Sequence, residues 1–255
     1  MDTVIIGSGN VASVLGRKIL ASGHRILQVA ARNEVKGKHL ADQLGADHAP
    51  DLSQINRNAT LYIVAISDDA LPGLQGILKL ERAVIVHTAG SVSKEVLKGV
   101  CNNYGVLYPL QTLKANSDQI PEFPLLVDAN TADTLTLIRD FAETITDQVV
   151  EADDDYRKKI HLAAVVSGNF SNHLYALVQD YCNANKLDFT LLLPQIKEIV
   201  GNLKSGHAAA RQTGPALRND VETLNKHMEM LNAFPELSEI YELMTALILN
   251  YHSEK

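Results

Sequence analysis

The stretch that most constrains the fold is the first sixteen residues, which read MDTVIIGSGNVASVLG. The run Thr3 to Ile6 is short, apolar and rich in β-branched residues, which is typical of a buried parallel strand. Gly7, Gly9 and Ala12 then complete a G-x-G-x-x-A pattern, and apolar residues continue at helical spacing. This order predicts a strand, a glycine turn and a helix, with the turn directed at the helix N-terminus.

Each small residue of this pattern has a physical role in binding a dinucleotide. Gly7 permits the tight turn, Gly9 leaves room for a pyrophosphate against bare backbone, and Ala12 lets helix and strand pack closely. The alternative is a glycine-rich turn without ligand, but one glycine would meet that structural need. We therefore predict a cofactor site made by the turn and the first turn of the helix, formed by Gly7, Ser8, Gly9, Asn10, Val11 and Ala12.

The end of the second predicted strand indicates which dinucleotide is bound. This strand covers Ile26 to Ala31 and is followed by Arg32 and Asn33, with Lys36 and Lys38 close behind. A site specific for NAD places an acidic residue here to bind the ribose 2′-hydroxyl, whereas an Arg can hold a 2′-phosphate. The strand end has no Asp or Glu, so we expect NADP(H), with Arg32 and Asn33 at the cofactor. The alternative is that Arg32 is a solvated surface charge.

Alternating strands and helices continue to about residue 150. Short runs rich in apolar residues predict further strands at 61–66, 83–86, 105–108, 124–127 and 148–150, and residues 47–49 could form a short strand. Helices are predicted at 35–44, from Ser67, and at 131–144. This alternation predicts an α/β fold with a doubly wound, mostly parallel Rossmann sheet. Ligands bind at the carboxyl ends of such strands, so the loops after strands four and five add Ile66, Ser67, Ala89 and Gly90 to the expected cofactor site.

The pattern changes near Asp153. From there to Lys255 the sequence shows only helical periodicities, interrupted by Pro194, the pair Gly214-Pro215 and Pro235. We therefore predict a dinucleotide-binding Rossmann domain over residues 1–152 and a second, all-helical domain over residues 153–255, which would bind the substrate and form a dimer interface.

Composition limits the class of partner. A net charge of −7 argues against nucleic acid or an anionic membrane as the main partner. No apolar run approaches the length of a membrane span, and Met1 leads directly into the first strand without a signal peptide. Cys101 and Cys182 have no metal-binding or redox spacing. We therefore expect a cytoplasmic protein without a bound metal.

The helix that opens the second domain carries an unusual polar face. At 100° per residue an apolar face separates from a polar one that holds Lys158, His161, Asn169, Asn172 and His173. Solvated helix faces favour Lys, Glu and Gln, so paired His and Asn residues indicate hydrogen-bonding groups kept for a ligand. The alternative is a polar face packed against the first domain. We predict His161 as the proton donor, with Lys158, Asn169 and Asn172 beside it.

Other polar residues complete the predicted substrate site. Gln111 follows the strand at 105–108, and His173 lies at the edge of the polar face. Arg218 precedes a helix start and could hold an anionic group of the substrate or a carboxylate of the other domain. For Asp220 the sequence favours a helix-capping role over a catalytic one.

The sequence resembles a known family over essentially its whole length. The residues that carry the resemblance are Gly7 to Ala12, His87 to Gly90, Tyr108 to Gln111, His161 to Ala164 with Asn169, and Thr213 through Arg218 and Asp220 to His227. The chain resembles NADP oxidoreductases with a Rossmann-like N-terminal domain and a C-terminal helical domain of unknown function. It is more distantly similar to pyrroline-5-carboxylate reductases, to 6-phosphogluconate and β-hydroxyacid dehydrogenases, and to deazaflavin-linked NADP reductases.

Two departures from these relatives bear on function. The family pattern has Arg-Gly-Asp where this chain has Arg218-Asn219-Asp220. The Lys and Asn that β-hydroxyacid dehydrogenases use on the first interdomain helix are not reproduced, because His161 is followed one turn later by Val165. The resemblance implies NADP(H)-dependent hydride transfer to or from a small molecule held between the two domains. The missing pair favours the alternative, a non-catalytic NADP(H)-binding regulatory or assembly protein.

The helical part predicts self-association. Its apolar stripes over residues 153–181, 187–203 and 235–251 are broader than about 100 residues of helix can cover. We therefore expect a homodimer formed mainly through the helical domain.

Overall fold

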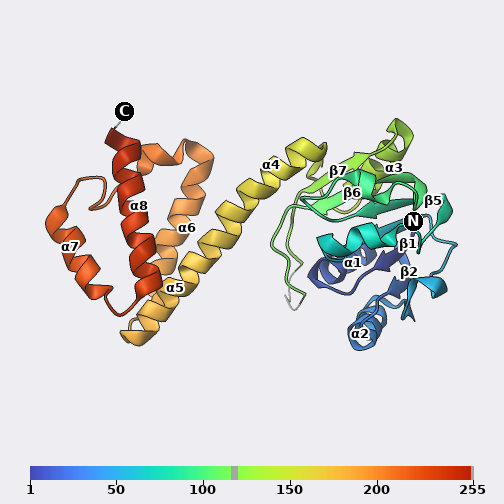
Figure 1. Ribbon diagram of the computed structural model, residues 1–255, viewed down its shortest axis with the longest axis horizontal. Helices are drawn as coiled ribbons and strands as arrows, with labels where there is room; N and C mark the ends of the chain where they lie inside the picture. The colour runs from blue at the N-terminus through green and yellow to red at the C-terminus, as the bar shows by residue number, and fades with distance from the viewer. Residues whose placement is uncertain (116–119, 254–255) are drawn as a thin grey trace. The chain divides into compact units, whose positions relative to one another are not determined.

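The computed structural model describes residues 1–115 and 120–253, and Figure 1 shows its helices and strands. The chain divides into two compact units, Met1–Ser167 and Gly168–Lys255. The described residues of the first unit form a sheet with covering helices, and those of the second form helices alone.

An eight-stranded sheet forms from the described residues of the first unit. Only β6 and β7 pair antiparallel, and the other neighbouring strands pair parallel. Every strand expected from the sequence is present, which confirms the mostly parallel Rossmann-like sheet. Across the sheet the order is β3 (Asp47–Ala49), β2 (Arg25–Ala30), β1 (Asp2–Ile6), β4 (Leu61–Val64), β5 (Leu80–His87), β6 (Cys101–Pro109), β7 (Leu125–Ala129) and β8 (Val149–Glu151).

Three α-helices cover one face of the sheet: α1 (Asn10–Ala21), α2 (Glu34–Leu44) and α3 (Ala132–Glu143). Successive side chains of a strand point to opposite faces, so Ile5 packs under these helices while Val4 and Ile6 pack on the other face. Because both faces are covered, the central strands are buried throughout, and this explains why their sequences read as continuous apolar runs.

The second face is covered by short 3₁₀ helices. These are η1 (Leu52–Gln54), η2 (Asp68–Leu74) and η3 (Lys94–Leu97). The sequence predicted a helix from Ser67, and Ser67 does precede η2, but the segment is 3₁₀ and contains Pro72. A proline inside an α-helix removes an N–H and clashes with a preceding carbonyl, which accounts for the shorter form. Leu71 and Leu74 are still buried.

The last strand ends at Glu151, and from Asp154 onward the described elements are all helical. The first of them is α4 (Asp154–Ala164), whose N-terminus is capped by the Asp153 carboxylate, which accepts a hydrogen bond from the Tyr156 N–H. A π-helical segment, η4 (Val165–Phe170), follows α4. The division between the compact units falls within η4, at Ser167 and Gly168. The first half of this helical stretch therefore belongs to the same compact unit as the sheet.

The second unit continues with α5 (Ser171–Ala184), α6 (Leu193–Asn202), α7 (Val221–Met230) and α8 (Pro235–Ser253), with short 3₁₀ helices between α5 and α7. The Asp220 side chain caps α7 by accepting hydrogen bonds from the Thr223 N–H and hydroxyl, as its sequence context predicts. The preceding Asn219 has a φ of 51°. Within residues 1–115 and 120–253, no helix combines the length and apolar character needed to cross a lipid bilayer.

Candidate functional site

The carboxyl ends of four parallel strands meet at one edge of the sheet. The strand registers pair Ile6 with Val64, Val64 with His87, and His87 with Val106. The loops that leave β1, β4 and β5, and the end of β6, therefore start side by side. Open parallel sheets bind their ligands at this edge, and the predicted cofactor loops are all found here or beside it.

The two glycines of the first loop differ in what the protein itself requires of them. Gly7 is buried with a φ of 121°, and an added Cβ would overlap the carbonyl oxygen of Ala65 at the end of β4. Gly9 is exposed, has a φ of −85°, and an added Cβ would meet nothing within 4 Å. Gly7 is therefore needed for the turn, whereas space at Gly9 is free for a ligand against the backbone.

Helix α1 begins at Asn10 directly after this loop, with Gly9 as its N-cap. A glycine cap offers no side-chain acceptor for the first free N–H groups, and the first turn has no acidic residue. These donors and the positive end of the helix dipole can therefore receive an anion. Asn10 accepts a hydrogen bond from the Ala115 N–H at 3.1 Å, while Ala12 is buried and Ser8 and Val11 are partly buried.

The loop after β2 carries the residues predicted to select the cofactor. Arg32 is exposed, and the Asn33 side chain caps α2 by accepting a hydrogen bond from the Lys36 N–H at 3.0 Å. Lys36 and Lys38 are also exposed. Arg32 therefore lies beside a helix N-terminus with two further cations near it in sequence, an arrangement suited to a phosphate group.

His161 on α4 contacts two residues at the carboxyl edge of the sheet. Its Nδ1 lies 2.9 Å from the hydroxyl of Tyr108 on β6, and the two rings meet edge to face with centroids 5.9 Å apart. A Cβ added to Gly90 would lie 2.6 Å from this Nδ1 and 2.8 Å from Cζ of Tyr108. Because Gly90 has no side chain, it leaves the space in which the imidazole and the phenol meet. The loop after β5 therefore packs against His161, the candidate proton donor.

The loop that carries Gly90 is shaped by a buried histidine. His87 ends β5 and is fully buried, and its Nδ1 accepts a hydrogen bond from the Ala89 N–H at 3.2 Å. Burial, and then the charge of Arg157, lower the pKa of His87 to about 4. The ring is therefore neutral at neutral pH, and it acts on the Ala89–Gly90 turn by hydrogen bonding.

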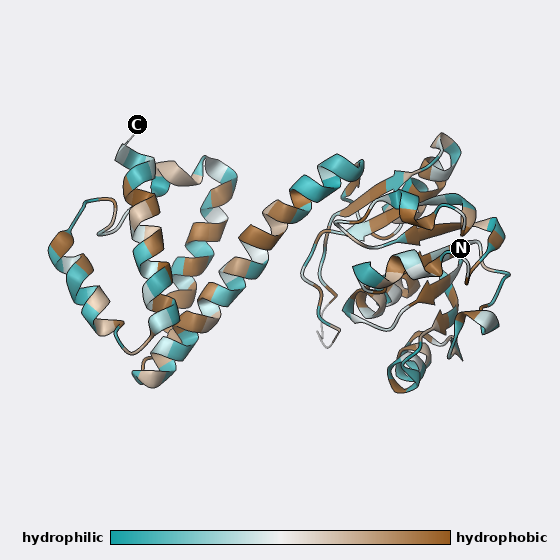
Figure 2. Cartoon of the chain, in the orientation of Figure 1, coloured by the Kyte–Doolittle hydropathy of each residue, from teal (hydrophilic) through white to brown (hydrophobic). Residues whose placement is uncertain are grey.

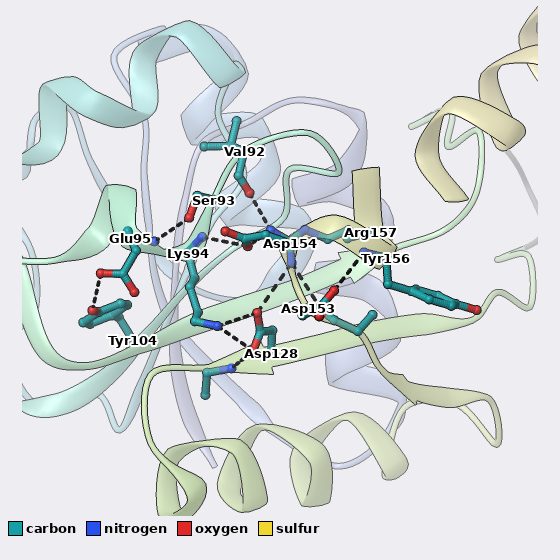
Figure 3. Close-up of polar contacts among 12 residues, drawn as sticks. Val92, Ser93, Lys94, Glu95, Tyr104, Asp128, Asp153, Asp154, Tyr156 and Arg157 are labelled. Carbon is teal, nitrogen blue, oxygen red and sulfur yellow. Dashed lines mark hydrogen bonds and ion pairs between the residues drawn. The ribbon is translucent and has the colours of Figure 1, made fainter. Parts of the chain in front are cut away.

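A buried ion-pair network fixes the first turn of α4 on the sheet unit (Figure 3). The guanidinium of Arg157 is fully buried and donates hydrogen bonds at 2.6 Å to both the Val92 carbonyl and the Asp154 carboxylate. Asp128 on β7 lies 3.9 Å from the same guanidinium and pairs with Lys94 at 2.8 Å. Leaving one partner of such a buried pair unpaired costs about 3–5 kcal/mol, so the network holds the helix that carries His161 in one position.

Hydrogen bonds also set the charge of Asp154 in this network. Burial by itself would raise the pKa of Asp154, but hydrogen bonds from Ser93 and Arg157 outweigh it and keep the pKa below its usual value. The Lys94 N–H adds a hydrogen bond at 3.3 Å. Asp154 is therefore ionised at neutral pH and stabilises the charge of Arg157.

Another carboxylate lies at the start of η2, which follows β4. Asp68 accepts a hydrogen bond from the Ser91 hydroxyl at 2.6 Å, next to Gly90 in the chain. Burial, and then the negative charge of Asp68, raise the pKa of Tyr108. Of the residues predicted in these loops, Ser67 is exposed, Ile66 is partly buried near Gly7, and Ala89 is buried.

The remaining predicted residues are exposed and are not joined to this cluster by a contact within their own unit. Lys158 on α4 is exposed, and Gln111 accepts a hydrogen bond from the neighbouring Thr112 N–H. Three residues of η4 and α5 and one before α7 belong to the second compact unit, where all four are exposed: Asn169, Asn172, His173 and Arg218. Their placement on one face with His161 assumed 100° per residue, which the π-helical segment interrupts, so their roles stay predictions.

Sequence reasoning gave no role to several residues that build this site. Tyr108 was noted only as part of a family pattern, and Arg157, Asp128, Asp154 and Lys94 were not singled out. A buried arginine cannot be told from a solvated one by helix periodicity, and its ion-pair partner Asp128 lies on β7, which is distant in the sequence. For Tyr108 the available signal was its place at the carboxyl end of a predicted strand.

Comparisons with known proteins agree with this geometry. Residues 3–90 match the family described as NADP oxidoreductase coenzyme F420-dependent, and residues 123–248 match a domain of unknown function (DUF2520). No curated protein matches the chain. A crystal structure from Bacteroides fragilis, described as a candidate NADP oxidoreductase, is 36% identical, covers 98% of each chain and has a TM-score of 0.92.

Two more distant structures share the fold. A 1-pyrroline-5-carboxylate reductase from Streptococcus pyogenes is 16% identical, covers 98% of each chain and has a TM-score of 0.64. A reductive aminase from Aspergillus terreus, in complex with NADPH and ethyl-5-oxohexanoate, is 17% identical, covers 99% of this chain and 94% of that one, and has a TM-score of 0.73.

Proposed function

Because this chain belongs to the NADP oxidoreductase family in which a Rossmann-like domain precedes the domain of unknown function, we propose that it is an enzyme that transfers a hydride between NADP(H) and a small molecule. The observation that carries the proposal is the shared sheet edge, where the glycine loop follows β1 and the cluster of Gly90, Tyr108 and His161 lies at the ends of β5 and β6. The glycine loop suits a dinucleotide, and the cluster offers a proton donor.

The residues present fit NADP(H). The open backbone at Gly9 and the N-terminus of α1 would hold the pyrophosphate. Arg32, with Asn33 beside it, would hold the 2′-phosphate, and Ile66, Ser67, Ala89 and Gly90 are proposed to line the rest of the cofactor. When bound, NADP(H) supplies or accepts the hydride.

His161 is proposed to act on the heteroatom of the substrate. When a carbonyl or imine carbon is reduced, its oxygen or nitrogen must gain a proton, and an imidazole titrates near the pH at which enzymes work. His161 is held by Tyr108 and Gly90 at this edge, and the Arg157 network fixes its helix. Lys158, Asn169 and Asn172, with Gln111, His173 and Arg218, remain proposed substrate-orienting residues.

Purified protein tests the proposal in two steps. Calorimetry first measures binding of NADPH. Consumption of NADPH is then followed with small imines and 2-oxo acids, and formation of NADPH from NADP+ is followed with hydroxy acids. On an identified substrate, His161→Ala should lower turnover by about 10²–10⁴ without loss of NADPH affinity, the usual range for a general acid. Full activity in this variant would assign the histidine a structural role only.

The absence of the Lys-Asn pair supports a second candidate, a protein that binds NADP(H) and regulates or assembles with others without turnover. Tight NADPH binding together with no turnover on any of these substrate classes would favour it.

A further inference from the structure

The hydrogen bond between Tyr108 and His161 leaves one edge of the imidazole free. The edge formed by Cγ and Nδ1 packs on Gly90, and Nδ1 is paired with the Tyr108 hydroxyl at 2.9 Å. The Nε2 atom lies on the far side of the ring and makes no hydrogen bond to the described residues of the chain. The side chain of His161 is half-buried, so this free edge can meet a ligand.

The position of the shared hydrogen follows from the surroundings of the phenol. Burial raises the pKa of Tyr108, and the carboxylate of Asp68 raises it further, so the phenol keeps its hydrogen. Among the described residues, Nδ1 of His161 is the atom paired with that hydroxyl. A half-buried hydroxyl that donates to Nδ1 satisfies both atoms.

We infer that Tyr108 is a positioning residue that holds neutral His161 as the tautomer with its hydrogen on Nε2, so that the free edge of the ring is a hydrogen-bond donor. In the charged ring, Nδ1–H donates to the Tyr108 oxygen and Nε2 again carries a hydrogen. The free edge therefore donates in both charge states of the ring.

Because Nε2 carries a hydrogen in both charge states of the ring, it limits which chemical groups can bind to this edge. An Nε2–H binds an oxygen or nitrogen that has a free lone pair, and it binds more strongly as negative charge develops there. The site thus recognises an acceptor atom such as a carbonyl oxygen or an imine nitrogen, rather than a hydroxyl hydrogen to be removed. This role in recognising the substrate rests on the proposed function, whereas the inference about the tautomer does not.

Long-range proton–nitrogen NMR on the cofactor-free protein reads the tautomer directly. The protein is labelled at its histidines, the His161 signals are assigned by their loss in His161→Gln, and spectra are recorded at a pH where the ring is neutral. We expect Nδ1 to resonate as an unprotonated nitrogen and Nε2 as a protonated one. In Tyr108→Phe this preference should be lost, so that the two nitrogens shift toward each other.

Tyr104→Phe is the matched control. Tyr104 lies on the same strand, but its hydroxyl bonds Glu95 at 2.9 Å instead of His161, so its loss should leave the tautomer unchanged. On an identified substrate, Tyr108→Phe should lower kcat about three- to tenfold with unchanged NADPH affinity, as loss of one hydrogen bond predicts. A hydrogen on Nδ1 in the wild type, or a tautomer unaffected by Tyr108→Phe, would overturn the inference. If NMR shows the expected tautomer but no substrate is turned over, only the proposed function is contradicted, and the inference about the tautomer stands.

Discussion

At the scale of single residues, Arg32 is expected to determine the choice between the two nicotinamide cofactors. It is exposed beside the N-terminus of α2, and the end of β2 carries no carboxylate to bind a ribose hydroxyl. A charge-assisted hydrogen bond to the 2′-phosphate contributes about 1.5–3 kcal/mol, which is about tenfold or more in affinity. Calorimetry should show that NADPH binds more tightly than NADH and that Arg32→Ala removes most of the difference.

Arg57→Ala provides the control for this measurement. Arg57 is another exposed arginine, but it precedes β4 and therefore lies toward the opposite edge of the sheet, where it bonds the Lys79 carbonyl. Its removal should leave both affinities unchanged. Equal affinities of the wild type for NADPH and NADH would contradict the role given to Arg32.

A second residue-scale prediction concerns His87 and acid stability. Its pKa is 6.5 in the unfolded chain but about 4 in the folded one, because burial disfavours the charged ring. As pH falls below 6.5, His87 becomes protonated in the unfolded chain but stays neutral in the folded one. The free energy of unfolding therefore falls until pH reaches about 4. At about 1.4 kcal/mol per pKa unit, this one group contributes a loss of about 3 kcal/mol.

Urea titrations across this pH range measure the loss. His87→Asn keeps an acceptor for the Ala89 N–H without a titrating ring, so its stability should depend less on pH than that of the wild type. His39→Asn, at an exposed position on α2, controls for removal of any histidine. The role of His87 would be wrong if wild type and His87→Asn lost stability equally on acidification.

At the scale of elements, the β1–α1 connection allows fold and ligand binding to be separated. Gly9→Val adds a side chain into open space, so we expect a nearly unchanged melting temperature but no NADPH binding, because the pyrophosphate needs that space. Gly7→Val forces a β-branched residue to a φ of 121° against the Ala65 carbonyl, so it should lower the melting temperature strongly. Retained NADPH affinity in Gly9→Val would show that the phosphate loop lies elsewhere.

Elements with regular periodicity were predictable, and elements whose form depends on a local interruption were not. The central strands could be located because burial on both faces gives each a short apolar run. The 3₁₀ form of η2 and the π-helical η4 change the number of residues per turn, which apolar spacing alone does not reveal. The sequence could place His161 on a polar helix face. It could not identify Tyr108 and Gly90 as neighbours of His161, because periodicity within one helix does not show which residues of other elements it contacts.

At the scale of the whole molecule, the family was predicted correctly from motifs spread along the chain. The 36% identical structure from Bacteroides fragilis, which covers 98% of the chain, confirms that prediction. The glycine loop was recognisable because its chemistry is local. The ion pair of Arg157 with Asp128 was not, because it joins α4 to a strand that is distant in the sequence. A single sequence carries no record of such long-range pairs.

The second compact unit provides the last prediction, because it buries few of its own apolar residues. Among its described residues the buried apolar side chains are Cys182, Ala216 and Leu231. On α8, Leu243 and Leu247 are 60% and 52% exposed, and Figure 2 shows hydrophobic residues along this helix. A soluble monomer rarely leaves so much apolar helix surface uncovered. We therefore predict that a second copy of the chain covers these helices.

Light scattering during size-exclusion chromatography should then give a mass of twice 27.8 kDa at micromolar concentration. Leu247→Glu places a charge on the apolar surface of α8, so it should shift the protein toward monomer, because an unpaired charge is costly to bury at an interface. Ile77→Glu is the matched control, since Ile77 is 68% exposed but lies in the sheet unit, and this variant should remain a dimer. A wild-type mass of 27.8 kDa would mean that the exposed helices of the second unit are not covered by a second copy.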